Sequence, residues 1–375
     1  MRRIISKSLR AIVGGSLAAC GLSLLLSSNA WSSADYKLET VTDGLNHPWS
    51  VAFLPNGEFL VTELGGKLLR LSADGSKKTI IGGVPDTYVA QQGGFFDIVL
   101  HPDFKSNKQV YLSYAHGGPD ANGTGIIRAT LGKERLENTE LIMLVATVKD
   151  TPVHYGGRML FRPDGTLLVT TGDGFEYREK AQDLSTELGK VLRINPNGVA
   201  AADNPFPDRG SPRVWTYGHR NPQGLALNSD TGEIYLHEHG AKGGDELNIL
   251  QAGKNYGWPA ITLGVDYSGA HVTPFKELPG MEQPAWFWVP SIAPSGLAWY
   301  GGTAFPQWHG DLFVGALVNK DVRRLDLEDG KVVGEEILFG EIGERIRDVR
   351  SGPDGYLYLL TDSKDGKLIR VKPDE

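Results

Sequence analysis

The stretch FRPDGTLLVTTGD, residues 161–173, joins a tight turn to a strand-like run of apolar and β-branched residues. An Asp-Gly turn in front of such a run is typical of a β-hairpin. The chain contains this combination of an apolar residue, a turn rich in Pro, Asp and Gly, and a strand-like run six times, at intervals of about 45 to 80 residues. The other five copies are residues 53–63, 100–115, 227–240, 305–317 and 351–362.

Six hairpin units at this spacing predict an all-β protein, a six-bladed β-propeller with its active site at the mouth of the central channel. The composition agrees, because 48 Gly and 21 Pro among 375 residues favour many short strands over long helices. Only residues 181–195 leave room for one short helix. We therefore expect a single propeller domain over residues 35–375.

The N-terminus predicts export. Residues 1–10 are basic and residues 11–26 are apolar, so we interpret residues 1–34 as a signal peptide that directs the chain to the periplasm. The apolar run is shorter than the ~20 residues that a membrane-spanning helix needs. The single cysteine, Cys20, lies within it, and a lipoprotein anchor through Cys20 is the alternative.

Charge and cysteine content exclude other classes. The net charge is −7 and no basic patch is present, which argues against nucleic acid as a partner. The folded body carries no thiol, so it has neither a disulfide nor a cysteine nucleophile. We expect a monomer or a homodimer.

Several loops next to predicted strands carry polar residues that suit chemistry. His154 stands at a loop tip, where a neutral imidazole can act as a general base. Arg220 and Asn221 follow a predicted strand and precede a proline that restricts the backbone. Arg345 and Arg347 alternate, which places both on one face of a strand, where they suit a polyanionic ligand.

Each of these residues also has a structural interpretation: a histidine bonded to backbone, a polar turn, or a solvated basic edge. The Gly-rich, acidic segment 237–269 is similarly open. Its carboxylates and backbone oxygens suit Ca²⁺, but it lacks the spacing of an EF-hand and can equally be a surface loop. Together the residues argue for holding a small polycarboxylate and moving a proton.

Seven motifs then carry a resemblance over nearly the whole mature chain. They stand in the order HPWSVAFLP, QGGFFDIVLHPDF, HYGGRMLF, YGHRNPQGLA, EHGAKGGDELN, GKNYGWP and RIRDVRSGPDGYLYLLTD. The chain closely resembles the soluble aldose sugar dehydrogenases that use pyrroloquinoline quinone (PQQ), relatives of soluble glucose dehydrogenase. That family has a six-bladed propeller fold with the quinone at its mouth, in agreement with the six hairpins.

The resemblance implies oxidation of aldose sugars at C1 to the lactone, with electrons passed to an external acceptor. His154 would take the proton from the C1 hydroxyl while hydride passes to the quinone. Arg220 would stabilise the charge that develops on the quinone oxygens. The residues implied to contact the cofactor are Gln92, Arg220, Asn221, Tyr267, Lys320, Arg345 and Arg347.

The resemblance also implies calcium. One Ca²⁺ would bridge the quinone and the main-chain carbonyls around Gly240 and Ala241, polarising a cofactor carbonyl. A second, structural Ca²⁺ would use Glu246 and the region of Tyr256. In the family Pro is frequent where Ala241 stands; a backbone carbonyl ligates from either residue.

Another departure lies in the segment GALVNK, where relatives often have a lysine that contacts the cofactor. Here Val318 occupies that position, so Lys320 or Asn319 would have to replace the contact. Two alternatives to the dehydrogenase are a calcium-dependent sugar lactonase and a non-catalytic propeller that binds sugar or a partner. Three arginines that suit a cofactor favour the dehydrogenase.

Overall fold

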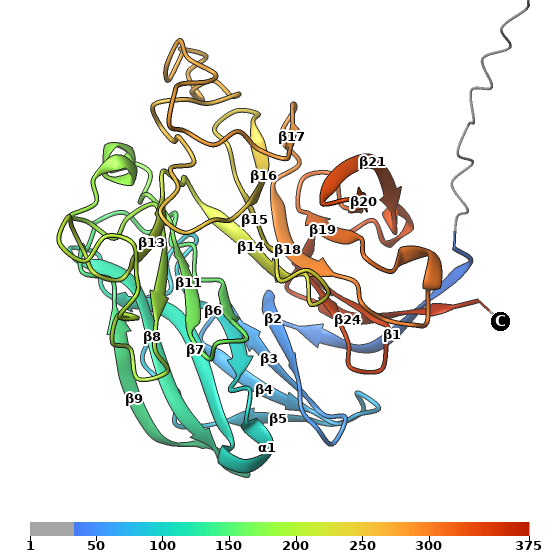
Figure 1. Ribbon diagram of the computed structural model, residues 1–375. Helices are drawn as coiled ribbons and strands as arrows, with labels where there is room; N and C mark the ends of the chain where they lie inside the picture. Colours follow the sequence, from blue (N-terminus) through green and yellow to red (C-terminus); the bar gives the residue numbers. More distant parts are fainter. Residues whose placement is uncertain (1–33, 375) are drawn as a thin grey trace, which may run out of the picture. The chain divides into compact units, whose positions relative to one another are not determined.

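The computed structural model describes residues 34–374, which form six four-stranded antiparallel sheets in a ring (Figure 1). This confirms the predicted six-bladed β-propeller. Cys20 and residues 1–33 of the predicted signal peptide lie outside the described residues. Of that peptide, the structure describes Ala34 alone. Within residues 34–374, no helix is long and apolar enough to cross a membrane.

The blades follow one another along the chain. The first three contain β2 (Pro48–Phe53), β3 (Phe59–Glu63), β4 (Lys67–Leu71) and β5 (Lys78–Ile81); β6 (Phe95–Leu100), β7 (Gln109–Gly117), β8 (Asn122–Leu131) and β9 (Leu136–Leu144); and β10 (Met159–Phe161), β11 (Leu167–Thr171), β12 (Lys190–Ile194) and β13 (Val214–Tyr217). The last three contain β14 (Pro222–Leu227), β15 (Ile234–Glu238), β16 (Asp245–Ile249) and β17 (Trp286–Trp288); β18 (Pro294–Trp299), β19 (Leu312–Ala316), β20 (Val322–Glu328) and β21 (Lys331–Leu338); and β22 (Ile346–Ser351), β23 (Leu357–Thr361), β24 (Gly366–Pro373) and β1 (Tyr36–Leu45).

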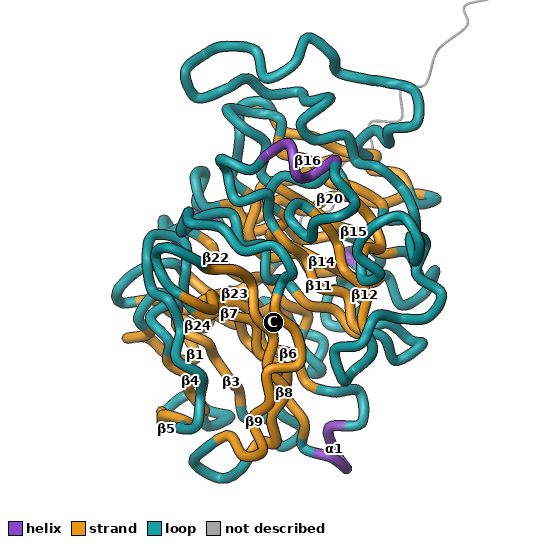
Figure 2. Tube along the Cα trace, turned by 90° about the vertical axis from the view of Figure 1, so that its left-hand side faces the viewer, coloured by secondary structure: helices purple, strands orange, loops and turns teal. Residues whose placement is uncertain are grey.

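In the part of the chain that the structure describes, helical structure is confined to short turns (Figure 2). It comprises α1 (Phe104–Asn107) and the 3-10 helices η1 (Arg178–Gln182), η2 (Pro306–Trp308) and η3 (Gly340–Ile342). The short helix allowed for residues 181–195 corresponds only to the end of η1, because most of that stretch is a loop and β12.

Each of the six predicted hairpins joins the first two strands of one blade. The turn in residues 161–173, for example, joins β10 to β11. Gly165 in that turn has a φ of +80°, a left-handed conformation that glycine adopts without steric cost. The first strands of the blades face the central channel and contact one another around the ring. The repeated hairpins therefore place six loops at one end of the channel.

The ring closes because the first strand joins the last blade. β1 pairs antiparallel with β24, with Tyr36 opposite Pro373 and Thr40 opposite Ile369. In Figure 1 the blue β1 lies beside the red β24. An ion pair reinforces the junction, since Arg370 Nη2 lies 3.0 Å from Glu39 Oε1.

Apolar side chains fill the space between neighbouring blades. In one such cluster Leu60 and Leu68 of the first blade pack with Phe95 and Leu112 of the second. All four are buried. Burial of this kind drives the stacking of blades, because each sheet has an apolar face that only its neighbour covers.

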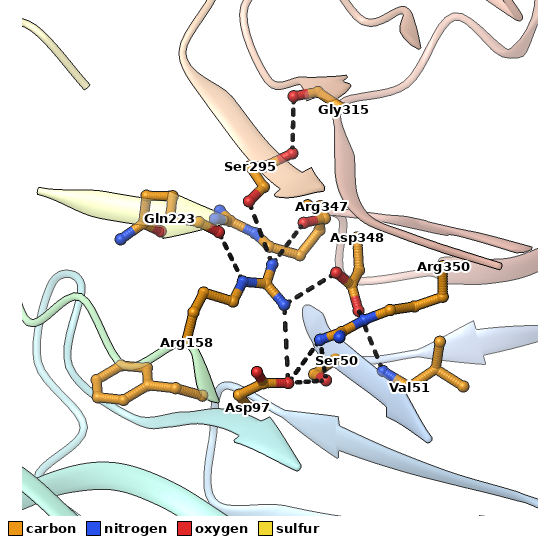
Figure 3. Close-up of polar contacts among 12 residues, drawn as sticks. Ser50, Val51, Asp97, Arg158, Gln223, Ser295, Gly315, Arg347, Asp348 and Arg350 are labelled. Carbon is orange, nitrogen blue, oxygen red and sulfur yellow. Dashed lines mark hydrogen bonds and ion pairs between the residues drawn. The ribbon is translucent and has the colours of Figure 1, made fainter. Parts of the chain in front are cut away.

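A buried ion cluster occupies the centre of the ring (Figure 3). Arg158 is only 3% exposed, and its Nη1 lies 2.9 Å from Asp348 Oδ1 and 3.8 Å from Asp97 Oδ1. Arg350 reaches the same carboxylates, at 2.6 Å from Asp97 Oδ1 and 2.9 Å from Asp348 Oδ2. Two cations and two anions thus balance each other away from water.

Hydrogen bonds extend this cluster to every blade. Arg158 Nε donates to the carbonyl of Gln223 at 2.6 Å, and its Nη2 donates to the carbonyl of Ser295 at 3.4 Å. Ser50 Oγ donates to Asp97 Oδ1 at 2.6 Å. Because these residues lie on or beside the innermost strands of different blades, one cluster sets the positions of all six (Figure 3).

We predict that Arg158→Leu destabilises the fold by about 3 to 5 kcal/mol, because it leaves two buried carboxylates with one guanidinium. Urea unfolding measures the loss. The control is Arg128→Leu, which removes a surface ion pair in which Arg128 Nη2 lies 2.7 Å from Glu140 Oε2. Its loss should lower the free energy of unfolding by less than about 1 kcal/mol. Equal losses in the two variants would contradict a central role for the cluster.

Candidate active site

A cavity of about 480 Å³ lies at one end of the channel, where the innermost strands begin. Every blade contributes to its wall. The lining residues are His47, Trp49, Leu64, Gln91, Gln92, Phe96, Tyr155, Gly156, Asn221, Gln223, His239, Ala293, Leu317, Arg345, Arg347 and Asp362. The structure therefore brings together four of the predicted cofactor contacts, Gln92, Asn221, Arg345 and Arg347, from three distant parts of the chain.

The two arginines converge on one carboxylate. Arg345 Nε lies 3.3 Å and Arg347 Nη2 lies 2.7 Å from Asp362 Oδ2, so both lie on one face, as their spacing predicts. His47 Nδ1 lies 2.9 Å from the other oxygen of Asp362. Burial opposes ionisation of Asp362, but Arg347, His47 and Arg345 hold the pKa of its carboxyl well below the usual range. Two guanidinium groups against one carboxylate leave a positive charge beside the cavity.

Asp362 is a site residue that the sequence analysis missed. Its signal was its place at the end of β23, directly after the last repeated hairpin. Without the fold, nothing showed that it meets Arg345 and Arg347, which precede and begin the neighbouring strand.

His154 lies beside this cavity and is 5% exposed. Its backbone N–H donates to Gln92 Oε1 at 2.8 Å, and its Nδ1 lies 2.6 Å from Asp173 Oδ1. Since a carboxylate only accepts, Nδ1 carries the proton and Nε2 carries the lone pair. Burial lowers the pKa of His154; the bond to Asp173 opposes this, while the charges of Arg220 and Lys149 add to it. The imidazole is thus held neutral, in the tautomer that a base needs.

Asp173, the second missed residue, orients this imidazole. Besides His154, it accepts hydrogen bonds from Trp258 Nε1 at 2.7 Å and from the backbone N–H of Phe175 at 2.7 Å. Burial opposes its ionisation, but the bond and charge of His154 and the charge of Arg220 lower the pKa of Asp173 below its ordinary value. A base bonded to an oriented carboxylate is the arrangement that general-base catalysis uses. The only sequence signal was its place at the end of the stretch 161–173, two residues after β11.

Arg220 and Asn221 face the site from the loop before β14. The backbone N–H of Arg220 donates to Glu238 Oε2 at 2.5 Å, and its guanidinium donates to the carbonyl of Gly240. That guanidinium lies 5.3 Å from the ring centroid of Trp258 and 5.8 Å from that of Tyr267.

Asn221 joins this loop to the loop that carries His154. Its Oδ1 accepts a hydrogen bond from the backbone N–H of Gly156 at 3.3 Å. A side chain added at Gly172 would meet both the carbonyl of His154 and this amide oxygen. The stretch YGHRNPQG is therefore held rigidly against the His154 loop.

A second, smaller cavity of about 10 Å³ adjoins Arg220. Space of this size holds about one water molecule or ion. Gly240, Glu246 and Tyr256, three of the predicted calcium residues, line it together with Glu238. Burial and the negative charge of Glu238 raise the pKa of Glu246 to about 8.

The fourth predicted calcium residue, Ala241, is buried next to Gly240 but is not among the residues lining either of these two cavities. Within the described chain, no three His, Cys, Asp or Glu side chains gather closely enough to hold a metal ion. A cation here would therefore need backbone carbonyls in addition to the carboxylates.

Two other predicted cofactor contacts lie further out. Tyr267 is 60% exposed and stands at the rim, over Arg220. Lys320 is exposed, like Val318 and Asn319, and the cavity wall contains Leu317 instead. A contact from Lys320 to a bound group stays a prediction.

Comparison with known proteins decides the family. A family model described as glucose/sorbosone dehydrogenase matches residues 45–370. The chain belongs to the glucose/sorbosone dehydrogenase family. The resemblance read from the seven motifs is thereby confirmed, and so is the enzyme class, a sugar dehydrogenase.

The similarity of this dehydrogenase to its relatives extends over most of the chain. It is 41% identical over 359 residues to the aldose sugar dehydrogenase YliI of Escherichia coli, covering 93% of this chain and 96% of the relative. It is 27% identical to the quinoprotein glucose dehydrogenase B of Acinetobacter calcoaceticus, covering 88% and 86%. The structure of a PQQ-bound aldose sugar dehydrogenase from Streptomyces coelicolor is similar, with a TM-score of 0.75, 27% identity and coverage of 90% and 99%.

We predict that sugar oxidation by this dehydrogenase follows the titration of His154. Because the base must be neutral and burial lowers the pKa of His154 below its ordinary value, kcat/KM should rise with pH over a range below that of an ordinary imidazole and then reach a plateau. Asp173→Asn should lower the plateau about 10²- to 10⁴-fold. It should also move the acid limb to lower pH, because it removes the negative partner that raises the pKa of His154.

The measurement is a pH–rate profile of both proteins. Asp183→Asn, a change at a partly exposed carboxylate outside the cavity, is the control and should leave the profile unchanged. An acid limb that moves upward in the Asp173→Asn variant would contradict the pairing of Asp173 with the base.

Proposed function

We propose that the protein oxidises aldose sugars at C1 to the lactone with PQQ as its cofactor and passes the electrons to an external acceptor. The observation that supports this most is the pairing of His154 with Asp173 beside a cavity that Arg345 and Arg347 make positive. A base and an anion-binding cavity in contact are what a dehydrogenase with an anionic cofactor requires.

The residues of the large cavity fit PQQ. The cofactor is a flat tricarboxylate, and a cavity of about 480 Å³ is of the size that binds small cofactors. Arg345 and Arg347 would pair with its carboxylates, and Gln92 and Asn221 would offer amide groups. When bound, PQQ supplies the two-electron acceptor that the side chains of this protein lack.

The protein's own residues would handle the proton. His154 Nε2 would accept the proton of the C1 hydroxyl, since Nδ1 is engaged by Asp173. The Asp173 carboxylate would then stabilise the imidazolium, as it does in any oriented acid–base pair. Arg220, buried and fixed by Glu238 and Gly240, would hold a positive charge where negative charge develops.

The small cavity fits a cation such as Ca²⁺. Glu246, Gly240 and Tyr256 line it, and a carboxylate with backbone oxygens is the donor set that Ca²⁺ prefers. When bound near the cofactor, Ca²⁺ supplies Lewis acidity. The carbonyl of Gly240 accepts the guanidinium of Arg220 here, so a bridging ion at Gly240 and Ala241 would have to share that carbonyl.

The two alternative functions have less support. A calcium-dependent lactonase needs carboxylates free to hold a metal in the channel, yet Asp97 and Asp348 are both paired with Arg158 and Arg350. A non-catalytic propeller would need no oriented base. We also propose export to the periplasm through residues 1–34.

The first test is reconstitution. The mature chain, purified without cofactor, should reduce a dye with glucose and other aldoses only after PQQ and Ca²⁺ are both added. His154→Ala should abolish turnover while PQQ binding, followed by its absorption spectrum, stays nearly intact. Retained turnover in His154→Ala would eliminate His154 as the base, and a wild-type protein that binds no PQQ would exclude the quinone-dependent reaction.

Arg347 provides a second prediction. Arg347→Gln should weaken PQQ binding about 10- to 100-fold, because it removes a charged hydrogen-bond donor from the cavity. Quenching of tryptophan fluorescence measures the affinity, since Trp49 lines the same cavity. Arg209→Gln, a change at an exposed arginine, is the control. Unchanged affinity in Arg347→Gln would place the cofactor elsewhere.

A further inference from the structure

Phe175 is a large apolar residue of the site that the mechanism above does not use. The residue is 41% exposed, although aromatic residues of this size are usually buried. Its ring centroid lies 5.3 Å from that of His154, with the two planes at 84°. An exposed aromatic ring in edge contact with the base stands where a substrate must approach.

The backbone holds this ring in place. Phe175 has a φ of +68°, a left-handed conformation that a bulky residue adopts only when its surroundings enforce it. Its N–H donates to Asp173 Oδ1 at 2.7 Å, the same oxygen that His154 Nδ1 contacts at 2.6 Å. One carboxylate oxygen therefore fixes the ring and the base relative to each other.

The loop around Phe175 is tied on both sides. Tyr177 Oη donates to Asp150 Oδ1 at 2.8 Å, on the segment that leads to His154. Arg178 Nη1 lies 3.7 Å from Asp266 Oδ2, in the fourth blade. These contacts connect the loop of Phe175 to the two neighbouring segments.

Phe175 lies at the ring of His154, outside the wall of the cofactor cavity. The backbone of His154 bonds to Gln92, which lines the 480 Å³ cavity, whereas its ring contacts Phe175, which is absent from that cavity's wall. The neighbouring Tyr267 ring, 6.3 Å away, continues the aromatic surface outward. The space next to Phe175 is thus open to solvent and adjacent to the base.

We propose that Phe175 is a specificity-determining residue, forming the wall against which the C–H face of an aldose ring lies while its C1 hydroxyl faces His154. This inference rests on the proposed function. A pyranose with equatorial hydroxyls presents axial C–H groups on its faces, and these carry the partial positive charge that the negative face of an aromatic ring attracts. Aldopyranoses rich in equatorial hydroxyls, such as glucose, are the sugars this wall fits.

The test compares one substitution that removes the flat ring with one that retains it. Phe175→Leu should raise KM for glucose about tenfold at about pH 8, where His154 is neutral, with kcat nearly unchanged. Phe175→Tyr should keep KM within about twofold, because it retains the aromatic face. Phe275→Ala, a change at an exposed phenylalanine outside the cavity, is the matched control.

Binding of 1-deoxyglucose, which cannot be oxidised at C1, gives a readout independent of turnover. Calorimetry with and without PQQ should show the same loss of about tenfold in Phe175→Leu, and PQQ affinity should not change. Unchanged sugar affinity, or an equal loss of PQQ affinity, would overturn the inference. Sugar binding that depends on Phe175 without any oxidation would support the wall and contradict the proposed function.

Discussion

The structure depends on one buried arrangement of charge, the contact of Arg158 with Asp97 and Asp348. A six-bladed ring has no continuous core, because its innermost strands surround an axis that side chains must fill. Here charged side chains, rather than apolar ones, fill the space along that axis, and their hydrogen bonds reach every blade. Leaving one of these buried charges without its partner would be strongly destabilising, so the ion pairs constrain the innermost strands that carry them.

That cluster lies on the same strands as the site. Asp97 follows Phe96, Asp348 follows Arg347 and Arg158 lies two positions after Gly156, so these three central residues are one or two positions from a residue at the cavity. Strand geometry alternates side chains between directions, and the same strands that anchor the axis therefore present groups to the ligand. The innermost strands of the six blades therefore support both the fold and the site.

The fold could be predicted from sequence because its signals are local. Turns such as Asp164-Gly165 specify a hairpin without distant partners, and six of them specify the repeat. Arg345 and Arg347 could be placed on one face for the same reason. Asp173 and Asp362 could not be found this way, since each matters through a partner that lies far away in the sequence or across a neighbouring strand. The exposed position of Lys320 likewise depends on loop geometry that no spacing rule describes.

The pairing of β1 with β24 has a consequence for assembly. The cavity takes residues from every blade, so it exists only once the two ends of the chain have met. A ligand that binds there binds the closed ring and not the open one, and by thermodynamic linkage it stabilises the junction it never touches. Ligand binding at the site and closure of the ring by β1 and β24 are therefore thermodynamically coupled.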